Sequence, residues 1–110
     1  MTRVAVVGAG IMGAAAAWAL TARGAEVVVH EQFELDHDRG SSHGRSRIVR
    51  ISYPDPDWVR RAADARKGWA RLEEESGRTL LGTVGYVELA PAPELTSRAA
   101  LTAYGAEHRP

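Results

Sequence analysis

Three glycines near the start of the chain have the spacing of a loop that binds a phosphate group. Gly8, Gly10 and Gly13 lie in the stretch VVGAGIMGAA. The first two allow a tight turn and a close approach of the backbone to a pyrophosphate, and the third lets a helix pack against the preceding strand. The amide groups at the start of that helix would face the phosphates. The spacing therefore predicts a dinucleotide site.

The elements that must position these glycines are also visible in the sequence. Residues 3–7 (RVAVV) and 25–31 (AEVVVHE) predict two buried parallel strands, and residues 11–22 predict an apolar helix that Gly24 ends in a left-handed conformation. The second strand ends in Glu31, 18 positions after Gly13. A dinucleotide fold carries the acid that binds a ribose hydroxyl at about this distance, roughly 20 residues after the glycine turn. Because this acid would repel a 2′-phosphate, NADP is disfavoured. FAD and NAD both remain open.

Residues 39–50 (RGSSHGRSRIVR) form a basic loop that contains arginines and no acid. Its glycines and the hydroxyls of Ser41 and Ser42 suit a phosphate or the edge of a flavin, and His43 lies among them. Arg47 and Arg50 would share one face only on a helical turn, and an arginine fork binds a carboxylate through two hydrogen bonds. The preceding acidic run 31–38, which includes His37, is interpreted as a solvated loop.

Together these stretches resemble a known family. VVGAGIMGAAAAWALTARGAEVVVHE and GSSHGRSRIVRISYPDPDWV are similar to the N-terminus of monomeric sarcosine oxidase and N-methyltryptophan oxidase, flavin amine oxidases of the D-amino-acid-oxidase-like group. The resemblance extends over about residues 3–90 and covers only the first quarter of a typical member. It implies an α/β Rossmann-type βαβ unit that binds FAD, as the N-terminal part of a two-domain flavin oxidase.

The resemblance also implies roles for individual residues. Arg47 matches an arginine beside the isoalloxazine and Arg50 one that grips the amino-acid carboxylate; with His43 they are the expected catalytic residues. Ser42 and Ser46 depart from the histidine and threonine of sarcosine oxidase, which leaves the particular amine open. The cofactor-binding residues expected from the loop and the resemblance are Gly8, Gly10, Ile11, Met12, Gly13, Glu31, Ser41, Ser42, His43, Ser46 and Arg47.

The function implied by this resemblance is FAD-dependent oxidation of the CH–NH group of a secondary amine or N-methyl amino acid. The sequence is expected to be an N-terminal fragment that lacks activity by itself and implies a missing downstream domain. Residues 1–78 are predicted to belong to the FAD domain, and residues 79–110 to begin the substrate domain or to add flavin-domain elements. Two alternatives stay open, namely the NAD-binding half-domain of a dehydrogenase and a non-catalytic truncated remnant.

The remaining sequence predicts supporting structure. A helix is expected over about residues 57–76, capped by Asp55 or Asp57, with the tryptophans on its packed face. Residues 79–81 and 83–89 predict two short strands, and residues 94–104 a further helix. The packed face is expected to comprise Trp58, Ala62, Ala65, Trp69 and Leu72, and ion pairs four residues apart are expected at Arg60–Asp64 and Arg71–Glu75.

Composition excludes several classes of function. The 14 basic residues balance 14 acidic ones, so the charge does not favour nucleic acid or a membrane surface as a partner. The chain has no cysteine, which excludes disulfides, thiolate metal sites and a cysteinyl flavin link within it. No metal site, targeting segment or membrane span is expected, and a cytoplasmic location is predicted.

Overall fold

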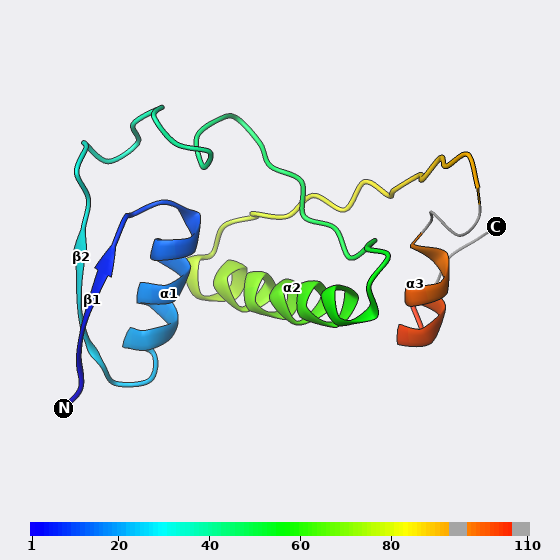
Figure 1. The fold of residues 1–110 in the computed structure, drawn as a ribbon. Helices are drawn as coiled ribbons and strands as arrows, with labels where there is room; N and C mark the ends of the chain where they lie inside the picture. The colour runs from blue at the N-terminus through cyan, green and yellow to red at the C-terminus, as the bar shows by residue number, and fades with distance from the viewer. Residues whose placement is uncertain (93–96, 107–110) are drawn as a thin grey trace. The chain divides into compact units, whose positions relative to one another are not determined.

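The computed structural model describes residues 1–92 and 97–106. Figure 1 shows the order of its elements. The chain divides into two compact units, Met1–Arg47 and Ile48–Pro110. The elements in order are β1 (Arg3–Val7), α1 (Ile11–Thr21), β2 (Glu26–His30), α2 (Pro56–Ser76) and α3 (Arg98–Tyr104).

The first unit is a βαβ unit. Strands β1 and β2 pair in parallel, with Arg3 opposite Glu26 and Val7 opposite His30. Parallel strands need a crossover connection, and α1 supplies it while packing against both strands. The predicted segments 3–7, 11–22 and 25–31 are therefore confirmed as strand, helix and strand, with ends that differ by at most one residue. The expected burial of the strands is wrong: their residues are exposed or half-buried, with Val7 87% and Val28 46% exposed, because among the described elements only α1 packs on them. The α/β fold class is confirmed as well.

Glycines set the close packing within this unit. A Cβ atom at Gly13 would lie 3.0 Å from the carbonyl carbon of Gly8, closer still to its oxygen, and 3.4 Å from a methyl carbon of Val6. Only glycine lets α1 approach the strand so closely. Gly24 has a φ of 82°, as expected for a left-handed position after the helix.

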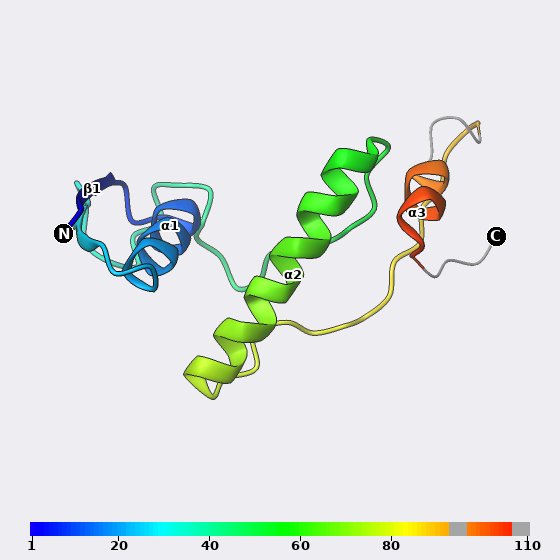
Figure 2. The same ribbon diagram turned by 90° about the horizontal axis from the view of Figure 1, so that it is seen from below.

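Helix α2 is the main element of the second unit, and Figure 2 shows it along most of its length. The side chain of Asp55 accepts a hydrogen bond from the amide of Asp57 at 2.8 Å, and Pro56 occupies the first turn. Gly77, with a φ of 65°, ends the helix. The predicted helix 57–76 and its cap at Asp55 are thus confirmed.

The predicted packed face of α2 is wrong by one position. The buried residues are Val59 and Ala63, whereas Trp58 is 58% exposed. Small side chains allow α3 to pack on this helix, and Ala100 of α3 is buried as well. The Trp58 ring instead packs beside Tyr53, with ring centroids 6.4 Å apart. Of the other expected members, Ala65 is exposed, and the half-buried ones are Ala62, Trp69 and Leu72.

The ion pairs of α2 agree with the expectation in part. Arg60 pairs with Asp57, three residues before it, and no ion pair between Arg60 and Asp64 is present among the described residues. The recorded pairs are Asp57–Arg60 (2.9 Å), Asp64–Lys67 (2.7 Å) and Arg71–Glu75 (3.3 Å), of which only the last was predicted.

The two strands predicted over residues 79–89 are not present. The amides of Leu80 and Leu81 donate to the Glu73 carboxylate, at 2.6 and 2.9 Å, so they do not enter a strand ladder. Apolar side chains on both faces of the expected strand are exposed, at Val84 (93%), Val87 (81%) and Leu89 (92%). A strand needs a partner and a buried face, and this segment finds neither among the described residues.

The described residues test one further prediction only in part and leave another untested. Residues 94–96 of the helix predicted over 94–104 lie outside the described residues, and the described part of it is α3. The domain boundary after residue 78 stays a prediction. Among the described helices, none has the length and apolar character needed to span a bilayer.

Candidate functional site

The glycine turn joins β1 to α1 in a conformation that favours glycine. Gly8 has a φ of 97°, which few other residues adopt. Its amide donates to the carbonyl of His30 at 2.7 Å and so extends the pairing of β1 with β2. The turn is thereby fixed at the carboxyl ends of both strands, where α/β folds bind their ligands.

The N-terminus of α1 lacks a cap from its own first residues. Gly10 occupies the capping position and has no side chain that could accept a hydrogen bond. The amide of Ile11 donates to Ser42 Oγ at 3.0 Å. The amides of Met12 and Gly13 have no acceptor within the described part of the chain. Helix N-termini with free amides bind phosphate groups, since the amides and the helix dipole both favour negative charge.

Glu31 connects the end of β2 to this turn. Its Oε2 accepts the amide of Ala9 at 2.7 Å, and its Oε1 accepts the amides of Gln32 at 2.8 Å and Phe33 at 3.1 Å. These hydrogen bonds, that of Ala9 most strongly, hold the pKa of the Glu31 carboxyl below its usual value. An ionised carboxylate beside the glycine turn is suited to accept a hydrogen bond from a sugar hydroxyl.

Arg47 closes the basic loop on itself. Its Nε donates to the carbonyl of Ser41 at 2.9 Å and its Nη1 to that of Ser46 at 3.1 Å. Its Nη2 bonds the carbonyls of Ser41 and His43. His43 in turn donates from Nδ1 to the carbonyl of Gly40 at 2.5 Å. The guanidinium therefore shapes the loop that brings Ser42 to α1, and Ser41 and Ser46 take part through backbone carbonyls.

Arg50 belongs to the second unit, and its contacts lie within that unit. Its guanidinium lies over the ring of Tyr53, 5.2 Å from the ring centroid. Glu88 accepts hydrogen bonds from the amide (2.9 Å) and hydroxyl (2.7 Å) of Ser97. These bonds lower the pKa of the Glu88 carboxyl, and the charge of Arg50 adds to the effect.

The expected site residues thus fall into two groups. The first unit brings together the glycine turn, Glu31 and Ser42, with Arg47 and His43 on the same loop as Ser42. Arg50 belongs to the second unit.

Comparison with known proteins identifies the family. The model of the DAO family, described as FAD dependent oxidoreductase, matches residues 3–110. The chain belongs to this family. It is 36% identical over 109 residues to a probable sarcosine oxidase of Arabidopsis thaliana, covering 96% of this chain and 26% of the relative. It is 43% identical over 94 residues to a monomeric sarcosine oxidase of Streptomyces avermitilis, covering 84% and 24%. The chain spans about a quarter of the length of these relatives.

The residues around the glycine turn fit FAD, the cofactor in the description of this family. A side chain at position 13 would collide with Gly8 and one at position 10 would lie 3.0 Å from Ser42 Oγ, so the backbone at the turn must stay bare. Free amides at Met12 and Gly13 suit a diphosphate. Among the described residues, no group of three metal-binding side chains is present.

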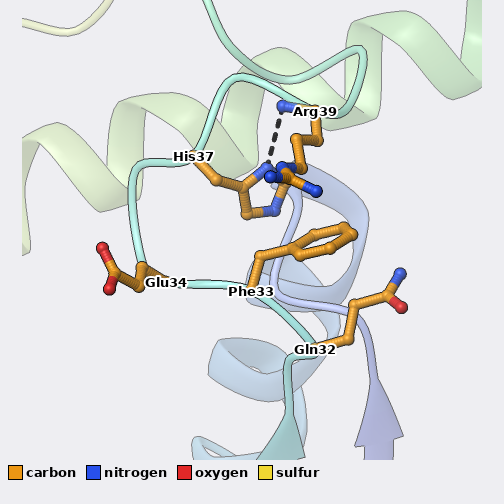
Figure 3. A pocket seen from close by; sticks show the side chains of 5 residues that line it. All are labelled: Gln32, Phe33, Glu34, His37 and Arg39. Carbon is orange, nitrogen blue, oxygen red and sulfur yellow. Dashed lines mark hydrogen bonds between the residues drawn. The ribbon is translucent and has the colours of Figure 1, made fainter.

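Sequence reasoning missed the turn that follows Glu31. Residues 31–38 were interpreted as a solvated acidic loop, but the side chains of Phe33 and His37 are partly buried. The imidazole Nε2 of His37 lies 3.6 Å from Glu31 Oε1. Figure 3 shows the pocket beside it, which is lined by Gln32, Phe33, Glu34, His37 and Arg39. The alternation of aromatic and acidic residues was the available signal, because a fully solvated loop has no need of Phe33.

Proposed function

We propose that this chain forms the FAD-binding part of an oxidoreductase that acts on the CH–NH group of secondary amines, N-methyl amino acids in particular. The observation that carries the proposal is the glycine turn with the ionised Glu31 held against it. The names of the relatives support the substrate class, since one is named a probable sarcosine oxidase and the other a monomeric sarcosine oxidase. A cytoplasmic location remains part of the proposal.

Each part of the first unit has a task toward this cofactor. The amides of Met12 and Gly13 bind the diphosphate, and Glu31 accepts a hydrogen bond from the ribose. Arg47 keeps the Ser41–Arg47 loop in shape and leaves a positive charge beside it. When bound, FAD supplies the redox chemistry, accepting a hydride equivalent from the carbon next to nitrogen.

Two residues of the basic loop 39–50 are assigned to the substrate and the flavin. Arg50 binds the carboxylate of the amino acid, for which a planar guanidinium is well suited. His43, whose Nδ1 is bonded to Gly40, keeps its other ring nitrogen for the flavin or substrate.

A binding experiment tests the cofactor. Titration of residues 1–110 with FAD should show binding that Glu31→Ala weakens by about 1–3 kcal/mol, because the variant removes an acceptor from a hydroxyl that binding desolvates. Glu74→Ala, at an exposed position on α2, is the matched control. Tighter binding of NAD than of FAD would contradict the proposal and favour the dehydrogenase half-domain.

Turnover is proposed to need more than this chain. Oxidation requires substrate and flavin to be held together at a defined distance, and the effective concentration falls steeply when part of the enclosing surface is missing. A peroxide assay with added FAD and N-methyl amino acids should therefore give no signal above free FAD with residues 1–110. A protein that continues this chain to the length of its relatives should give turnover.

A further inference from the structure

The ring of His37 lies against the carboxylate of Glu31. Its Nε2 is 3.6 Å from Glu31 Oε1, and both side chains are largely buried, with exposed fractions of 24% and 15%. This distance is longer than a hydrogen bond, so the contact is electrostatic in the resting geometry.

The backbone selects the tautomer of His37. The amide of Arg39 donates to His37 Nδ1 at 3.0 Å, the interaction drawn as a dashed line in Figure 3. An atom that accepts this proton carries none of its own, so the neutral ring holds its proton on Nε2. That proton is directed to the Glu31 side of the ring.

The orientation of the ring is also supported by packing. Phe33 meets His37 edge to face, with ring centroids 4.9 Å apart, and the guanidinium of Arg39 lies over Phe33 at 4.8 Å. The turn closes with the amide of His37 on the carbonyl of Glu34, at 3.3 Å. Asp36 adopts a φ of 68°, which is uncommon for a residue other than glycine. The surrounding contacts therefore hold the turn in a costly backbone conformation.

The two oxygens of Glu31 have different surroundings as a result. Oε1 accepts the amides of Gln32 and Phe33 and faces the Nε2 proton of His37. Oε2 accepts the amide of Ala9. Since each carboxylate oxygen offers about two acceptor positions, Oε2 keeps one for a further donor.

We propose that His37 is a positioning residue: its Nε2 proton faces Oε1 and, together with the amides of Gln32 and Phe33, holds the Glu31 carboxylate in the orientation that leaves Oε2 available to a ribose hydroxyl. This inference rests on the proposed function of Glu31 as the ribose acid. What it adds is a role for the 31–39 turn: the turn affects nucleotide binding only through the orientation of Glu31.

Two substitutions separate the two ring nitrogens. His37→Gln places an amide donor near the position of Nε2, whereas His37→Asn places its amide near Nδ1 and leaves nothing beside Glu31. Titration of residues 1–110 with ADP, followed by NMR, should show binding weakened roughly 2- to 10-fold by His37→Asn and largely restored in His37→Gln. His30→Gln is the matched control, since the His30 side chain is exposed on β2.

A measurement without ligand tests the same geometry. In nitrogen-15 NMR spectra at about pH 8, where an ordinary imidazole is neutral, Nδ1 of His37 should be unprotonated and Nε2 protonated. The Ala9 amide should shift in His37→Asn and not in His30→Gln. Exchange between both tautomers, as in an unstructured histidine, would overturn the proposal.

The outcomes distinguish this inference from the function on which it rests. If Glu31→Gln weakens ADP binding and His37→Asn does not, only the role of His37 is wrong. If Glu31→Gln leaves ADP binding unchanged, the assignment of Glu31 to the ribose fails, and the role of His37 fails with it.

Discussion

The N-termini of α1 and α2 differ in how the first amides of each helix are capped. Helix α2 is completed by its own neighbours, with Asp55 as the cap, Pro56 in the first turn and Asp57 near the positive end of the dipole. Helix α1 begins at Ile11, directly after Gly10 in the capping position, and has neither a capping side chain of its own nor an acid in its first turn.

The difference teaches how a binding helix can be told from a supporting one. At α1 a local cap would occupy the amides and place negative charge where phosphate must go. The side-chain acceptor that the described residues place at this end, Ser42, comes from 31 residues further along the chain. Between α1 and α2, the local cap is therefore present on the helix that supports the fold and absent on the helix whose end is available to a ligand.

The largest expected effect comes from a glycine-to-alanine change made in each helix. Gly13→Ala should destabilise the first unit by about 3 kcal/mol, the upper end of overpacking costs, because the new Cβ collides with the Gly8 carbonyl. Gly68→Ala in α2 meets nothing within 4 Å and should stabilise its helix by about 0.5–1 kcal/mol. Amide hydrogen exchange resolved by residue measures both.

The two substitutions are expected to change stability in opposite directions, and this difference is the test. Equal effects at positions 13 and 68 would mean that α1 does not approach the strand as described, and that Gly13 has no special role in the turn.

A cap transplanted to α1 tests the second difference. Gly10→Asp should weaken ADP binding at least about 10-fold, equal to 1.4 kcal/mol, because its carboxylate occupies the helix N-terminus and repels phosphate. Titration with ADP measures this loss. Gly10→Ala controls for bulk near Ser42, and if it loses as much affinity as Gly10→Asp, steric hindrance and not charge is responsible.

Removing the cap of α2 should have a smaller effect. Asp55→Ala is expected to cost about 1 kcal/mol of stability, since the amide of Asp57 loses its acceptor. Urea denaturation followed by circular dichroism measures the change. Asp55→Asn keeps an acceptor and should stay close to the parent; an equal loss in both variants would show that the charge matters more than the hydrogen bond.

The smallest effect expected is a dependence on acid pH. Glu31 and Glu73 both have a pKa below the ordinary value near 4.3, chiefly because backbone amides donate to them. Their contribution is therefore fully present above about pH 4.3 and is lost as the pH falls through the lower folded values. An NMR titration of the amides of Ala9 and Leu81 should report both losses, and midpoints above 4.3 would contradict the described hydrogen bonds.

The predictable part of the fold was the part determined by local pattern. Residues 3–31 carry a strand, a glycine turn, a helix and a second strand in immediate succession, so neighbouring residues define each element. The strands expected over 79–89 failed for the opposite reason, since a strand depends on partners remote in sequence. Glu73 instead binds the amides of Leu80 and Leu81, a contact that no periodicity indicates.

The candidate site divides along the same line. Gly8, Gly10, Gly13 and Glu31 were identified from spacing, since a phosphate-binding turn demands these residue types at these intervals. The packed face of α2 was placed one position away, because a helix pattern does not reveal which neighbour, here α3, will cover it.

The sequence by itself determined the βαβ unit, the bare helix N-terminus and the acid that faces it. These features follow from glycine's freedom at φ 97° and from the short β-branched runs that form the two strands. The tertiary structure alone decided that Ser42 reaches the amide of Ile11, that Arg47 binds its own loop, and that His37 lies against Glu31. Such contacts depend on how loops return in space, because a side chain's partner is set by distance and not by sequence interval.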